Sequence, residues 1–115
     1  MPGPRRLDAV FFRSASGSEP VREWLKGLPK DERTAIGEDI AYVQFKWPIG
    51  KPRVDHLRRS AGGTRVAGKS SSALFAVESG QMVLLHGFIK KTQQTPNAEI
   101  NLADRRFKEW QRGET

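Results

Sequence analysis

Two adjacent lysines, Lys90 and Lys91, are the residues of this 115-residue chain that are best suited to chemistry. They directly follow an almost wholly apolar segment, 82–89, whose composition is typical of a buried central strand. Paired cations at the end of such a strand can meet a polyanion and offset negative charge on a phosphate. Neighbouring side chains of a strand point to opposite faces, so we expect one lysine of the pair to reach a bound phosphate. The alternative is a lysine pair that simply ends a strand in solvent.

Two histidines and an arginine could assist such a site. His56 and His86 carry a side chain that titrates near neutral pH, so either could act as an acid or a base. A hydrogen-bonded core histidine is the favoured interpretation of His86, and a place in the site requires its face of the strand to be uncovered. For His56, a loop histidine bonded to backbone is favoured. Arg65 could hold a phosphate or be a solvated surface charge.

The overall charge favours anionic partners. The chain has 20 Lys and Arg against 13 Asp and Glu, a formal net charge of +7. Such a balance suits RNA, DNA, an acidic protein or a membrane surface, although solubility alone can also explain it. Contacts to phosphates that give affinity without sequence choice are expected from five cations: Lys51, Arg53, Arg58, Arg59 and Lys69.

Cysteine and hydropathy narrow the class of protein further. The chain has no cysteine, which excludes disulfides and thiolate metal sites, and its two histidines make a histidine-rich metal site unexpected. We therefore expect no metal and no other cofactor. No stretch approaches the roughly 20 apolar residues of a transmembrane helix. A cytoplasmic protein without a membrane partner is expected.

The pattern of apolar and turn residues predicts a single α+β domain over residues 1–115. Strands are expected at 7–13, 64–67, 70–77 and 82–89, with a hairpin turn at 78–81 between the last two. Helices with an apolar stripe at helical spacing are expected at about 19–28, 30–45 and 96–111. The order β-α-α-β-β-β-α favours a small antiparallel-rich sheet with the helices packed on one side.

Two longer segments carry a resemblance to a known family. They read IGEDIAYVQFKWPIGKP from residue 36 and MVLLHGFIKKTQQTP from residue 82, the latter followed by Glu99-Ile100, Ala103 and Arg106. With the order of elements, they resemble the HigB/RelE superfamily of bacterial toxins, in its phage-derived HigB-like branch. The resemblance implies a RelE-like, microbial ribonuclease-type fold. It also implies the toxin of a type II toxin–antitoxin pair, an endoribonuclease that cleaves mRNA on the ribosome.

The same resemblance implies partners and roles. A helix-turn-helix antitoxin would hold the toxin inactive, and DNA would be reached only through the antitoxin complex. Metal-independent RNA cleavage needs a base for the 2′-hydroxyl, cations for the charge on the phosphorane and a proton donor for the leaving oxygen. Lys90 and Lys91 would stabilise the phosphate. Arg65, where relatives commonly place an arginine facing the RNA, would assist, and His56 or His86 would carry the proton.

One segment, 62–72, departs from the family pattern. No aromatic residue or glutamate precedes Arg65, and three serines, 70–72, occupy a stretch where a cation is common in relatives. A second hypothesis therefore stays open: a basic domain that docks on RNA, the ribosome or an antitoxin without cleaving. Binding that weakens steeply with salt and leaves no new RNA ends would favour this second hypothesis.

Overall fold

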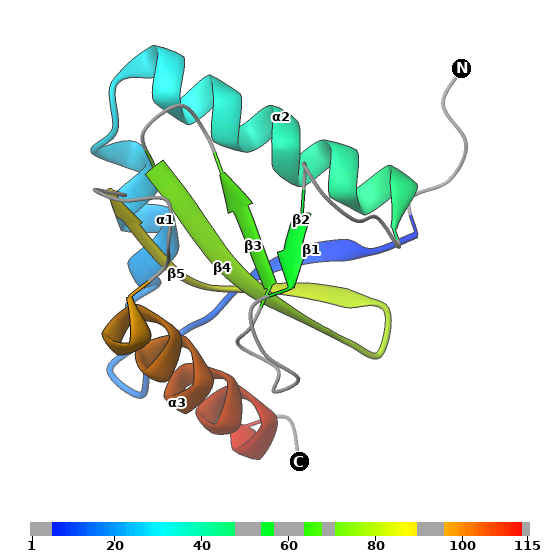
Figure 1. Cartoon of the computed structure of the whole chain (residues 1–115). Coiled ribbons are helices and arrows are strands. Elements are labelled where there is room, and N and C mark those ends of the chain that lie inside the picture. Colours follow the sequence, from blue (N-terminus) through cyan, green and yellow to red (C-terminus); the bar gives the residue numbers. More distant parts are fainter. Residues whose placement is uncertain (1–5, 48–53, 57–63, 68–70, 90–95, 114–115) are drawn as a thin grey trace.

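A computed structural model describes residues 6–47, 54–56, 64–67, 71–89 and 96–113, with the backbone alone for 54–56 and 64–67. The elements follow one another as shown in Figure 1. The strands are β1 (Asp8–Phe11), β2 (Val54–His56), β3 (Thr64–Ala67), β4 (Ser71–Glu78) and β5 (Gln81–Ile89). The helices are α1 (Pro20–Lys26), α2 (Lys30–Lys46) and α3 (Asn97–Gly113). The described residues therefore form an α+β fold, as the sequence pattern predicts.

The strands form one mixed sheet in the order β1-β5-β4-β3-β2. β1 pairs with β5 in parallel, and the remaining pairs are antiparallel, which confirms an antiparallel-rich sheet. β4 and β5 are joined by a tight turn in which Ser79 and Gly80 have φ angles of 53° and 73°. Two consecutive residues with positive φ are typical of the hairpin turns whose twist matches that of the flanking strands. The expected hairpin is thus present.

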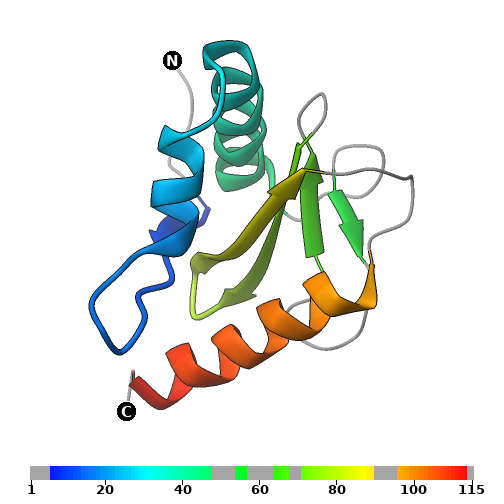
Figure 2. The ribbon, with the colours of Figure 1, turned by 90° about the vertical axis from the view of Figure 1, so that its left-hand side faces the viewer.

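The helices cover both faces of the sheet, so the expectation of helices on one side is wrong (Figure 2). Alternate residues of β4 show why, because Phe75 and Leu74 lie in separate apolar clusters. The cluster on the face of α1 and α2 contains Leu7, Val21, Ile36, Ile40, Val43, Phe75, Met82 and Leu84. The cluster on the face of α3 contains Phe12, Leu74, Ala76, Val83, Leu85, Phe88, Ile100, Ala103 and Phe107. A strand that is apolar on both faces requires cover on both.

The order of elements also differs from the expected one by an additional strand, β2. Its three residues pair antiparallel with β3, and Asp55 lies opposite Arg65. Three residues are too few to show the alternation of apolar and polar side chains by which strands are recognised. The pairing with β3 therefore creates a strand that the local sequence does not signal.

α1 packs on β5 through a contact that requires glycine. The ring of Trp24 lies directly against Gly87, so that a Cβ atom at position 87 would overlap Cε3, Cδ2 and Cζ3 of the indole. Because Gly87 has no side chain, the aromatic ring can approach the strand backbone closely. The second half of β5 is held in this way from the α1 side.

We expect Gly87→Ala to destabilise the protein by about 1–3 kcal/mol, because the new methyl group must displace the Trp24 ring. The measurement is urea unfolding followed by circular dichroism. Gly37→Ala is the matched control: Gly37 lies within α2, nothing lies within 4 Å of the added Cβ, and the change should stabilise by about 0.5–1 kcal/mol. Equal unfolding midpoints for the two variants would contradict the packing described.

Candidate functional site on β5 and α3

A β-bulge in β5 determines which way His86 faces. Leu74 of β4 pairs with His86, whereas the next residue, Phe75, pairs with Leu84. Leu85 is therefore an extra residue that has no partner in the register with β4. A bulge of this kind places two residues opposite one and re-aims side chains. Here it directs both Leu85 and His86 toward the face that α3 covers.

Arg106 of α3 stabilises the bulge from the face of the sheet that α3 covers. Its Nη1 donates a hydrogen bond of 2.8 Å to the carbonyl oxygen of Leu85, at the point where the ladder is interrupted. The guanidinium also lies over the ring of Phe12, 5.7 Å from its centroid. Burial lowers the pKa of Arg106 below its usual value, Arg105 lowers it further, and Glu109 opposes both. Because an arginine keeps its proton in proteins, the bulge carries a fixed, partly buried positive charge.

The imidazole of His86 connects two charged side chains of α3. Its Nε2 lies 2.8 Å from Oε1 of Glu99, and its Nδ1 lies 3.4 Å from Nη1 of Arg106. A carboxylate accepts and a guanidinium donates, so this geometry assigns the tautomer with a proton on Nε2. The ring also stacks on Phe88 with centroids 5.7 Å apart. Only 14% of the side chain is exposed, and both ring nitrogens are engaged within the protein.

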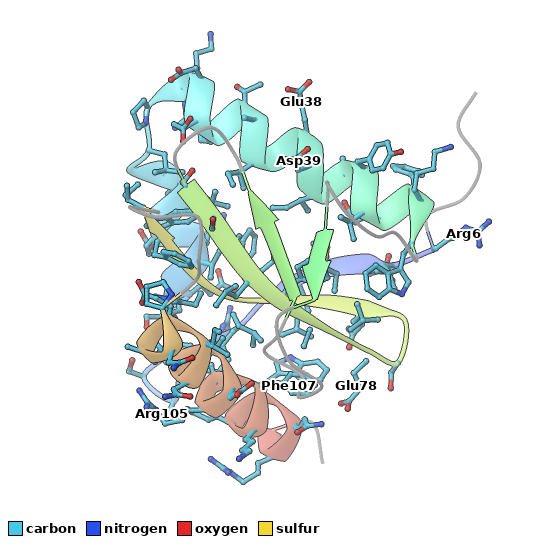
Figure 3. The ribbon with its side chains drawn as sticks, viewed as in Figure 1. Arg6, Glu38, Asp39, Glu78, Arg105 and Phe107 are labelled. Atoms are coloured by element: carbon cyan, nitrogen blue, oxygen red, sulfur yellow. The ribbon has the colours of Figure 1, made fainter. Side chains whose placement is uncertain are left out.

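α3 presents the two partners of His86 on the side that faces the sheet. Glu99 and Arg106 are seven residues apart, two turns of helix, and so lie on the same face as the apolar stripe. Phe107 lies on that side, whereas Arg105 lies on the opposite one and is exposed (Figure 3). Glu99 also stands in the first turn of the helix, where the helix dipole favours a negative charge. The cluster of His86, Glu99 and Arg106 therefore joins the start of α3 to β5.

The candidate residues named from sequence are distributed unevenly over the structure. His86 is covered by α3, a geometry that agrees with the hydrogen-bonded histidine, and its part in catalysis stays a prediction. His56 ends β2. Arg65 lies in β3. It pairs with Asp55 of β2 on one side and with Leu74 of β4 on the other, and Leu74 in turn pairs with His86 of β5. The lysines and arginines at 51, 53, 58, 59, 69, 90 and 91 lie outside the described residues.

Glu99 and Arg106 are not among the site residues that the sequence predicts, although the sequence holds a signal for them. Both lie at helical spacing from Ile100, Ala103 and Phe107, which form the buried stripe of α3. Charged residues of opposite sign on the rim of a buried stripe are rarely left unpaired, because burying an unpaired charge is costly. His86 in an apolar strand is a natural partner for such a pair.

The comparison with protein families agrees with the resemblance seen in the sequence. The family model described as phage-derived protein Gp49-like matches residues 23–108, which is most of the chain. The chain belongs to this family. Gp49-like proteins are HigB/RelE-like, toxin-type proteins. Among curated proteins, no sequence matches the chain.

The described part of the Gp49-like chain lacks features of a membrane span and of a metal site. Among the residues that the structure describes, no helix is long and apolar enough to cross a membrane. In the same ranges, no group of three His, Asp or Glu side chains is arranged to hold a metal ion. The cluster at His86 contains a single carboxylate and a single imidazole, and its third member is a cation.

Two adjacent serines of the Gp49-like chain, in the segment that departs from the family pattern, have different environments. Both Ser71 and Ser72 are fully buried. Ser71 Oγ donates a 2.9 Å hydrogen bond to Oε1 of Glu32, a buried carboxylate in the first turn of α2. Ser72 Oγ, by contrast, has no hydrogen-bond partner among the described residues. Ser71 thus has a structural role in joining α2 to β4.

We expect Ser71→Ala to destabilise the Gp49-like protein by about 1.5–3 kcal/mol, because the buried Glu32 carboxylate loses a donor. Ser72→Ala is the matched control and should be neutral or slightly stabilising, since it removes a buried hydroxyl that has no partner among the described residues. Thermal and urea unfolding of the two variants would measure the difference. Equal losses of stability would show that burial rather than the hydrogen bond decides.

Proposed function

We propose that this Gp49-like protein is the toxin of a type II toxin–antitoxin pair and acts in the cytoplasm as an mRNA endoribonuclease on the translating ribosome. The observation that carries the proposal is the family match over residues 23–108. The net charge of +7 supports a polyanionic substrate. A RelE-like fold is part of the proposal and is supported by the α+β architecture. A cognate helix-turn-helix antitoxin is the proposed protein partner.

The proposed chemistry is attack of the 2′-oxygen on the adjacent phosphorus. A base takes the proton of the 2′-hydroxyl, a 2′,3′-cyclic phosphate forms, and the bond to the 5′-oxygen breaks as that oxygen is protonated. A lysine of the Lys90–Lys91 pair would offset the charge that builds on the phosphorane, with Arg65 assisting, and each positioned donor can contribute about 10²–10³ in rate. Because both nitrogens of His86 are engaged, His56 is the better candidate for proton transfer. If the ribosome aligns the RNA, the protein need not supply an ideal base. The remaining five cations would contact the RNA backbone without reading its sequence.

The strand that precedes the lysine pair in the sequence supports this proposal. β5 is the strand between β1 and β4 in the sheet, and it ends at Ile89, directly before Lys90. Its second half contacts Trp24 from one face and Glu99 and Arg106 from the other. A strand restrained on both faces provides the rigid support that positioned catalytic groups need.

We expect Lys90→Ala/Lys91→Ala to lower RNA cleavage in a purified translation mixture by about 10²-fold or more, because the cations facing the phosphorane are lost. The measurement is mapping of RNA ends, with and without ribosomes. The matched control is Lys30→Ala/Lys46→Ala, which removes the same charge from exposed positions of α2 and should leave cleavage unchanged. Cleavage that survives in the Lys90→Ala/Lys91→Ala protein would refute the assignment.

A second candidate function is binding to RNA or the ribosome without cleavage. The departure of segment 62–72 from the family pattern favours it, since no aromatic residue or glutamate precedes Arg65. In the same assay this function would give no new RNA ends from the wild type. RNA would still be bound, with an affinity that falls steeply as salt rises.

A further inference from the structure

We propose that Glu99, His86 and Arg106 form a positioning cluster that fastens the first turns of α3 to the end of β5. Glu99 and Arg106 would act through His86 and the bulge rather than on the RNA. The structural part of the proposal stands on the described residues alone. Its catalytic part, that the cluster sets the geometry of the lysine pair, rests on the proposed function.

The cluster contacts one short stretch of β5 from two places on α3. Glu99, in the first turn, reaches Nε2 of His86 at 2.8 Å. Arg106, two turns further along, reaches Nδ1 of the same ring and the carbonyl oxygen of Leu85. Residues seven apart in a helix are separated by about 10 Å along its axis, so the two contacts restrain both the position of α3 and its rotation.

The cluster also restrains the two ends of one connection. His86 is three residues before Ile89, where β5 ends, and Glu99 is two residues after Asn97, where α3 begins. The residues that join these elements include Lys90 and Lys91. A contact between His86 and Glu99 therefore fixes where the chain leaves the sheet relative to where it enters the helix. A displacement of about 1 Å in such a support can cost about 10²-fold in rate.

The hydrogen bonds explain why the three members depend on one another. Arg106 is partly buried, and its pKa is lowered by that burial. Glu99, whose side chain is 30% exposed, accepts the hydrogen bond from Nε2 of His86. Removing Glu99 would leave Nε2 of His86 without its acceptor, and removing Arg106 would leave the Leu85 carbonyl without its guanidinium donor. The geometry thus makes the three residues interdependent.

The first test is amide hydrogen exchange, which does not depend on activity. We expect Glu99→Ala and Arg106→Ala to speed exchange about 10-fold or more at Gly87, Phe88, Ile100 and Ala103. Exchange at Val43 and Phe75, in the cluster on the other face, should stay unchanged. Lys108→Ala removes an exposed cation from the same helix and is the matched control. Unchanged exchange at the β5 end, or an equal rise throughout the protein, would overturn the proposal.

The second test separates positioning from substrate binding. We expect Glu99→Ala to lower kcat for RNA cleavage about 10-fold or more with little change in KM, and Glu99→Gln, which keeps a hydrogen-bonding oxygen, to recover much of that loss. A change in KM alone, or kcat unchanged while exchange rises, would overturn the catalytic part. If the wild type cleaves no RNA, the proposed function fails, and the exchange result still decides whether the cluster fastens α3 to β5.

Discussion

The fold depends on one constraint. The central strand β5 is apolar on both faces, so other elements must cover each face of the sheet. Leu84 packs against α1 and α2, whereas Leu85 packs against α3, so the strand contributes to both cores. The bulge at Leu85 allows His86 to share the α3 face instead of alternating away from it. Arg106 then meets the carbonyl that the bulge displaces. Secondary structure, packing and polar contacts at this point are consequences of a single inserted residue.

Most elements could be predicted from the sequence because their signals are local. The apolar run of β5, the turn at Ser79 and Gly80 and the stripe of α3 each follow from residues within a few positions. β2 could not be predicted, since its three residues become a strand only by pairing with β3. The apolar character of β5 on both faces indicates helices on both faces of the sheet. The expectation of helices on one side followed instead from the order of elements.

The candidate site was predictable in its residue types but not in its connections. The sequence marked His86 as a histidine in an apolar strand, and the structure supplies Glu99 and Arg106 as its partners. A bulge cannot be read from Leu84, Leu85 and His86, because the register depends on β4. Similarly, Ser71 and Ser72 are the same type of residue, but they point to opposite faces of β4. Only Ser71 therefore donates a hydrogen bond to the carboxylate of Glu32. Composition and residue spacing do not determine which elements far apart in the sequence contact one another.

The parallel pairing of β1 with β5 has a consequence for biogenesis. It joins Asp8 to Gln81, which are 73 positions apart in the sequence. Contacts so distant in sequence form late and slow the folding of a domain. A growing chain therefore holds an unfinished sheet until β5 has left the ribosome. A protein proposed to attack translation would complete its sheet only after β5 itself has been translated.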